Sequence, residues 1–155
     1  MAIFGTKKVE FAEVTPDGTM PLEADWEELC KTYRDSVEIV DNDPDIAEEY
    51  CDQMDEAIEI FIEAGKTDGK FSGYEYDPVT LQKLMGGTVV DNVWTEGSNR
   101  GIDMAIRFKT DSGHTIAYPV VKLFAKKNLK LVKKNVALID VIFKPKSKVS
   151  ITKPA

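Results

Sequence analysis

Isoleucine at every second position over residues 57–63 constrains this chain more than any other feature. A period of two is typical of a strand with one buried face, and it sets Ile58, Ile60 and Ile62 against Glu59, Phe61 and Glu63. The stretch 66–69 ends in glycine, which accepts positive φ without steric cost and suits a tight turn. Alternation resumes over residues 70–76. The pattern predicts a hairpin with strands at 57–63 and 70–76.

The segment after this hairpin carries the signature of one short helix at about 78–85. Asp77 has a side chain that can cap the helix, and Pro78 suits its first turn. Gly86 can adopt the left-handed conformation that ends a helix. One face of the segment is apolar through Leu81, Leu84 and Met85. We therefore predict a helix capped by Asp77 and Gly86.

The rest of the chain reads as short strands separated by turn signals. Strands are predicted at 7–14, 32–40, 88–93, 103–109, 114–125 and 136–143. The last is apolar on both faces, which is typical of a central strand. This spacing predicts a mainly β fold, an antiparallel β-sandwich or partly closed barrel with one short α-helix. At 155 residues the chain is expected to form a single domain, 1–155, with a loose basic tail at 148–155.

Two segments allow more than one interpretation. Residues 21–29 could begin a short helix or form an irregular lead into a strand. Residues 41–56 favour a helix on pattern alone, since Ile46, Tyr50 and Met54 recur at helical spacing behind Asp43-Pro44. The same residues also tolerate an extended conformation.

Charge is distributed very unevenly along the chain. Residues 1–63 hold 19 Asp and Glu against 4 Lys and Arg, whereas residues 112–155 hold 1 against 10. Such polarity suits head-to-tail contact between copies. It is equally compatible with neutralisation inside one fold, if strands from the two ends lie side by side.

The side chains needed for catalysis are scarce. His114 is the only histidine and lies in a predicted hairpin turn, where we expect an exposed polar residue. Gly86 and Gly87 follow a helix, whereas a phosphate-binding loop precedes one. The last third of the chain has ten lysines and no arginine, a composition poorly suited to recognising the bases or phosphates of nucleic acid. We therefore predict neither an enzyme nor a cofactor.

The strongest metal candidate is the run Asp41, Asp43, Asp45 with Asp52 at the twelfth position. It resembles a calcium loop, but Ile46 stands where the sharp turn needs glycine. We predict no metal site. Cys30 and Cys51 are expected to be free thiols, as in a reducing cytoplasm. No apolar run approaches the ~20 residues of a membrane span, and the first residues lack the order of a signal peptide.

The order of these elements resembles that of phage tail tube proteins, a group that includes the Hcp secretion-tube proteins. The resemblance rests first on the hairpin and on the helix Asp77-Pro-Val-Thr-Leu-Gln-Lys-Leu-Met-Gly-Gly87 that follows it. It continues through Thr88-Val-Val, Trp94, the pair of strands within 104–124 and the closing strand that ends Ile142-Phe-Lys-Pro145. It covers most of residues 6–147, the expected core. It implies a virion protein, made in the host bacterial cytoplasm, that forms stacked hexameric rings as a conduit for DNA. Its partners would be copies of itself and other tail proteins, and DNA would pass without specific binding.

The resemblance also implies which segments line the tube. Long hairpins, here 32–56 and 57–76, would join edge to edge between subunits, with 41–56 a strand and a tip near Asn42 to Pro44. The isoleucines would then face the packed side. The predicted lumen-facing residues are Glu59 and Glu63, with Glu48 or Glu49 and Asp52 as their neighbours. The alternatives are that these carboxylates only face solvent, or that the chain is a monomeric ligand- or ion-binding β-sandwich.

Overall fold

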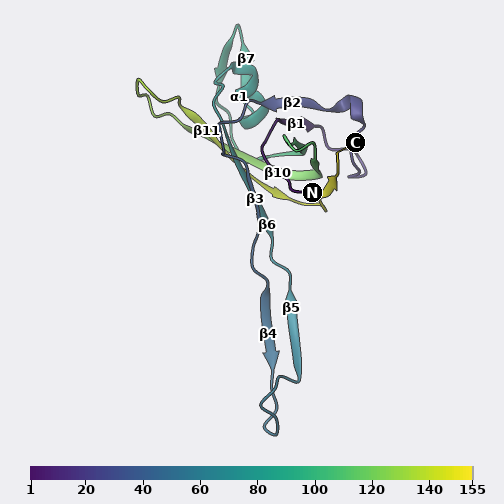
Figure 1. Ribbon diagram of the computed structural model, residues 1–155. Helices are drawn as coiled ribbons and strands as arrows, with labels where there is room; N and C mark the ends of the chain where they lie inside the picture. Colours follow the sequence, from purple (N-terminus) through teal and green to yellow (C-terminus); the bar gives the residue numbers. More distant parts are fainter. Residues whose placement is uncertain (155) are drawn as a thin grey trace.

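The computed structural model describes residues 1–154. Over these residues the protein is mainly β, with antiparallel pairing and one α-helix, as the sequence predicts (Figure 1). The strands are β1 (Lys8–Ala12), β2 (Glu27–Cys30), β3 (Glu38–Asp41), β4 (Asp45–Glu49), β5 (Glu59–Glu63), β6 (Thr67–Gly73), β7 (Thr88–Val90), β8 (Val93–Thr95), β9 (Ile102–Lys109), β10 (Thr115–Asn128), β11 (Leu138–Pro145) and β12 (Ser150–Thr152). The α-helix is α1 (Pro78–Met85), and a single 3₁₀ turn, η1, covers Glu23–Asp25.

The main sheet has the order β2-β1-β9-β10-β11-β6-β3, and β12 pairs with β10. Just after β2, Thr32 forms a bridge with Gly73 of β6, and the Tyr33 N–H donates to the Ser72 carbonyl at 2.7 Å. The sheet therefore curls so that its first strand leads back to its sixth. The pairs β4–β5 and β7–β8 are separate two-stranded ribbons.

The core fills the concave side of this sheet and is closed by α1. Leu81, Leu84 and Met85 are buried on the helix, as predicted from their spacing. Opposite them, four aromatic rings pack together, with centroids 5.5 Å apart for Phe108–Phe143 and 6.1 Å apart for Phe71–Phe108; the fourth is Tyr118. Offset and edge-to-face pairs of this kind add to the stability that burial alone provides.

The two helix caps have different outcomes. Gly86 occupies the C-cap position with φ 73°, and its N–H donates to the Gln82 carbonyl at 3.0 Å, so the predicted cap position is confirmed. Its ψ of −150° lies outside the left-handed helical region. Asp77 occupies the N-cap position, but its side chain makes no capping hydrogen bond. The Trp94 indole N–H donates to the Gly86 carbonyl at 2.7 Å and thereby covers the end of the helix.

The hairpin predicted around 66–69 is wrong. β5 and β6 follow one another along the same limb, and the chain reverses instead at residues 50–58 (Figure 1). Gly69 is not a turn glycine, since its φ is not positive. It is required because a Cβ there would lie 2.0 Å from Cζ of Phe143. The glycine makes room for an aromatic ring rather than for a reversal.

The predicted tip near Asn42 to Pro44 is also wrong. The Asn42 N–H donates to the Lys66 carbonyl at 2.9 Å, so pairing continues past β3 and resumes in β4. The expected hairpins 32–56 and 57–76 are thus the two limbs of one hairpin, β3–β4 and β5–β6. The strand interpretation of 41–56 holds for Asp45–Glu49, and the helical one does not.

Smaller differences concern the ends of strands. Residues 88–93, predicted as one strand, form part of the β7–β8 ribbon, because Asp91 and Asn92 turn the chain with positive φ. Residues 21–29 contain both η1 and the start of β2. The C-terminal tail is not loose, since Ser150–Thr152 pair with β10. β11 lies between β10 and β6, but Ile142 on its outer face is exposed.

A buried ion cluster ties the β1–β2 connection to the sheet. Arg107 on β9 donates to Glu10 of β1 at 2.9 Å and to Glu23 of η1 at 2.8 Å, while its guanidinium lies 4.7 Å from the ring centroid of Trp26. Burial opposes ionisation of Glu10, yet the Arg107 hydrogen bond and charge keep the pKa of Glu10 below its ordinary value. No sequence pattern predicts this contact between residues so far apart in the chain.

Replacing Arg107 by methionine should destabilise the protein by about 3 kcal/mol at pH 7, because it leaves the Glu10 carboxylate buried with only two half-exposed lysines nearby. The low pKa of Glu10 contributes stability above its ordinary value of 4.5 and loses it as the pH falls through the lowered pKa. Urea denaturation of wild type and Arg107→Met should therefore converge as the pH falls below 4.5. Glu23→Gln is the control, with a smaller effect because its carboxylate is exposed. A constant difference between the two proteins at all pH values would contradict this account.

Candidate self-association site

The most unusual feature of the molecule is a long hairpin that projects from the sheet (Figure 1). We call residues 42–66 the arm; it consists of β4, a tip at 50–58, and β5. Every residue of β4 and β5 is exposed. An isolated two-stranded ribbon is at best marginally stable in water. The arm therefore gains little from the core that holds the rest of the chain.

The register of the arm divides it into two different faces. Ile46 lies opposite Ile62 and Glu48 opposite Ile60, while Glu49 lies opposite Glu59. Because directly paired residues share a face and neighbours alternate, one face carries the isoleucines and the other most of the carboxylates. We call them the isoleucine face (Ile46, Glu48, Tyr50, Ile58, Ile60, Ile62) and the acidic face (Asp45, Ala47, Glu49, Glu59, Phe61, Glu63).

The isoleucine face has no partner within residues 1–154. The exposed fractions are 58% for Ile46, 54% for Ile58, 50% for Ile60 and 66% for Ile62. Complete burial of such a side chain contributes about 1.5–3 kcal/mol, so covering the exposed half of each isoleucine would contribute roughly half of that. Contiguous exposed apolar surface of this kind marks an interaction site rather than a random surface residue.

The predicted lumen-facing residues do not all share one face. Glu59 and Glu63 lie together with Glu49 on the acidic face, which selects Glu49 over Glu48 as their neighbour. Glu48 lies on the isoleucine face, because strand alternation separates it from Glu49. Asp52 belongs to the tip, outside the paired region. That Glu59 and Glu63 face a lumen remains a prediction.

Sequence reasoning missed Asp45, which lies directly opposite Glu63. Like charges in directly opposed positions destabilise an antiparallel ladder, and the acidic face contains two such pairs, Asp45–Glu63 and Glu49–Glu59. The wrong position of the turn hid this pairing. A reversal placed at 50–58 would have brought both pairs into register.

The arm is also a concentration of negative charge. Residues 41–65 contain ten Asp and Glu and neither Lys nor Arg. Within residues 1–154, every ion pair of the structure lies outside the stretch 42–66. Elsewhere opposite charges do meet, as in Lys144–Asp68 at 3.1 Å. Ion pairs within the chain thus neutralise charges on the sheet but none of the carboxylates of the arm.

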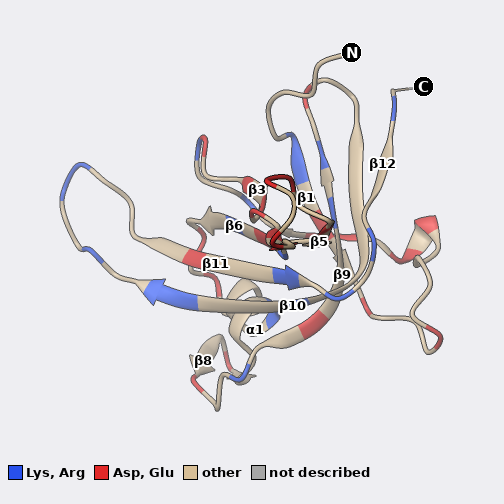
Figure 2. Cartoon of the chain, turned by 90° about the horizontal axis from the view of Figure 1, so that it is seen from below, with Lys and Arg blue, Asp and Glu red and all other residues tan. Residues whose placement is uncertain are grey.

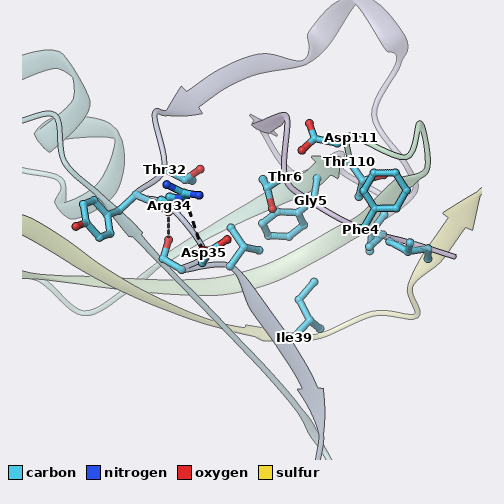
Figure 3. Close-up of a pocket in the computed structure, with 15 residues that line it drawn as sticks. Phe4, Gly5, Thr6, Thr32, Arg34, Asp35, Ile39, Thr110 and Asp111 are labelled. Carbon is cyan, nitrogen blue, oxygen red and sulfur yellow. Dashed lines mark hydrogen bonds and ion pairs between the residues drawn. The ribbon is translucent and has the colours of Figure 1, made fainter.

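The other candidate sites are weaker. A cavity of about 650 Å³ lies between the N-terminal segment, the loop before β3 and the β9–β10 turn (Figure 3). Its wall includes Phe4, Thr6, Ile39 and the exposed pair Arg34–Asp35, whose closest atoms are 3.8 Å apart. The ionisable side chains labelled in the close-up, Arg34, Asp35 and Asp111, are all exposed. It offers space but no recognisable chemistry.

His114 is buried, contrary to expectation. Its Nδ1 lies 3.0 Å from the Ser112 Oγ, and its carbonyl accepts from the Thr110 N–H at 3.0 Å. These contacts close the β9–β10 turn. Cys30 is buried and Cys51 partly so, both free, and burial raises the pKa of the Cys30 thiol to about 12.

Within residues 1–154 the histidine, cysteine and acidic side chains form no cluster that could hold a metal ion, and the aspartates at 41, 43, 45 and 52 do not converge. None of the helices described is both long and apolar enough to cross a membrane. Neither the models of known protein families nor the curated proteins give a significant match to this sequence.

If the isoleucine face is an interface, replacing Ile58, Ile60 and Ile62 by threonine should abolish self-association. The stability of the monomer should change little, because these side chains lie outside the hydrophobic core. Threonine keeps the β-branch and hence the strand preference. Light scattering over a concentration series measures association, and urea denaturation measures stability. Val90→Thr with Val93→Thr, two exposed valines of the β7–β8 ribbon, is the matched control. Equal association of both variants and wild type would rule out the isoleucine face as an interface.

Proposed function

We propose that this protein is a structural subunit that self-assembles into stacked hexameric rings forming a phage tail tube. The observation that carries the proposal is the projecting arm, whose isoleucine face is uncovered in the single chain. Exposed apolar surface of this kind is typical of a contact between proteins. Burying it between copies removes the apolar side chains from water and satisfies the outer strand edges of the ribbon.

The order of the elements also supports the proposal. The resemblance to tail tube proteins rests on a hairpin followed by one short helix. In the fold a long hairpin does precede α1, although the chain reverses at 50–58 and not at 66–69. The protein would act by assembly and conduit formation rather than by turnover. Its partners would be copies of itself and other tail proteins, in a virion assembled in the bacterial cytoplasm.

The acidic face suits the inner wall of a DNA conduit. DNA is a polyanion, so carboxylates repel it and prevent the retention that lysines would cause. If the isoleucine face packs on a neighbouring subunit, strand alternation turns Glu49, Glu59 and Glu63 away from that contact. The wall would then let DNA pass without binding it.

Negative-stain electron microscopy of the purified protein tests assembly directly. We expect rings or tubes at micromolar to millimolar concentration, and sedimentation should show weaker association as salt shortens the Debye length below ~8 Å. The runner-up function, a monomeric β-sandwich that binds a small ligand in the cavity of Figure 3, predicts a monomer at every concentration. A monomer that persists at millimolar protein, whatever the salt, would contradict the tube.

Exchanging Glu59 and Glu63 for lysine should leave folding and tube formation intact, because exposed strand positions tolerate a change of charge. In assembled particles the same exchange should slow genome release, since lysines facing the conduit attract phosphates. Release is measured by the loss of infectivity and by DNA efflux from purified particles. The control is Glu38→Lys, an exposed glutamate at the root of the hairpin. Normal efflux from intact particles carrying both lysines would end the conduit hypothesis for these residues.

A further inference from the structure

A second surface of the same chain is complementary to the arm. β10 and β11 extend beyond the sheet as a hairpin (Figure 1), whose end we call the basic hairpin, residues 126–137. It contains five lysines and neither Asp nor Glu. Its exposed apolar side chains are Leu129 (55%), Leu131 (85%), Val132 (44%) and Val136 (54%). It therefore has the apolar character of the isoleucine face and the opposite charge.

The two surfaces cannot meet within one chain. The arm and the basic hairpin leave the sheet in different directions, and their ends are far apart in both views of the molecule (Figures 1 and 2). Seen along the arm, acidic segments gather at the centre of Figure 2, while lysines mark the far end of the β10–β11 hairpin. Lys127 is the one lysine of the basic hairpin in an ion pair, with Glu96 at 3.0 Å, among the residues that the structure describes. Lys126, Lys130, Lys133 and Lys134 are left for a partner, and the last three lie nearest the end of the hairpin.

We infer that the isoleucine face and tip of one copy dock on the basic hairpin of the next. Leu129, Leu131 and Val132 would cover the isoleucines. Glu48, on the isoleucine face, and Asp55 and Glu56, at the tip, would meet Lys130, Lys133 and Lys134. This contact supplies the partner surface for the assembly proposed above. Only the closure of such contacts into a ring rests on that proposal.

A second copy is the occupant that the charges favour. The density of carboxylates on the arm excludes nucleic acid and anionic lipid as its partners. The contact joins two different surfaces, so every docked copy still offers a free arm or a free basic hairpin. Such heterologous contacts propagate into rings or filaments instead of stopping at a dimer. The acidic face plays no part in the contact, which separates the roles of the two faces.

Charge exchange tests the pairing. One variant, with the changes Lys130→Glu, Lys133→Glu and Lys134→Glu, has an acidic arm and an acidic hairpin. A second, with Glu48→Lys, Asp55→Lys and Glu56→Lys, has a less acidic arm and a basic hairpin. Each alone should associate about tenfold more weakly than wild type. An equimolar mixture should recover, because the unchanged arm of the first variant meets the unchanged hairpin of the second. In the reciprocal contact, the three lysines introduced on the arm of the second variant face the three glutamates introduced on the hairpin of the first. Lys7→Glu with Lys148→Glu and Lys153→Glu is the control of equal charge change.

Cross-linking locates the contact independently of charge. Cys51 lies at the tip of the arm, and Cys30 is buried. Mild copper-catalysed air oxidation of the Lys133→Cys variant should yield an intermolecular disulfide between Cys51 and the thiol introduced at position 133, identified by mass spectrometry. The same treatment of Lys148→Cys should give no disulfide to position 148. Disulfides between two Cys51 thiols as the main product would overturn the inference, because arms would then meet tip to tip.

The outcomes separate the contact from the tube. Cross-links without rings or tubes would retain the contact and refute the proposed function. The contact alone would be refuted if tubes form without the disulfide from Cys51 to position 133 and if the charge exchange does not change their assembly. The basic hairpin could instead bind duplex DNA or phosphatidylglycerol vesicles. Loss of either binding in the Lys130, Lys133 and Lys134 variant, with self-association unchanged, would also overturn the inference.

Discussion

The packing of Phe143 over Gly69 is the contact on which the rest of the structure depends. Phe143 belongs to β11 and stacks with Phe108 of β9 at 5.5 Å, while Gly69 belongs to β6, the strand that continues into the arm. Any side chain at Gly69 would collide with the ring. The contact thus joins the aromatic core to the limb that leaves it. The direction in which β6 leaves the sheet is set inside the core and not by the exposed part of the arm.

The sequence predicted the body of the fold better than the arm. Alternation located the second half of β10 and β11 because their buried positions, such as Leu123 and Val141, repeat every second residue against one core. In β9 both faces are buried over 104–108, since Ala105 and Arg107 pack on the side away from that core. The arm shows the same alternation without a core, so the pattern identifies a strand and says nothing of where the chain reverses. From the pattern alone Gly69 is a turn residue. In the structure its lack of a side chain makes room for the ring of Phe143, which lies far away in the sequence.

Only part of the candidate site follows from the sequence, because alternation does not locate the turn. Placing Ile58, Ile60 and Ile62 on one face, opposite Glu59 and Glu63, follows from the period of a strand and holds in the structure. Their cross-strand neighbours depend on the register, which a turn in the wrong place alters. The Arg107 cluster lay beyond prediction, because nothing local links Glu10, Glu23 and Arg107. Asp77 illustrates the opposite case, a residue of the right type in the right place that makes no capping bond.

The root of the arm has a mechanical consequence. The two limbs approach so closely there that a Cβ on Gly65 would lie 2.1 Å from the carbonyl oxygen of Asn42. Because the gap between the two backbones cannot hold even a Cβ atom, the limbs have little room to slide past one another. The root therefore acts as a stiff joint and not as a hinge. In an assembly held through such arms, the pitch from one subunit to the next would be set by this joint and not by the surfaces that touch.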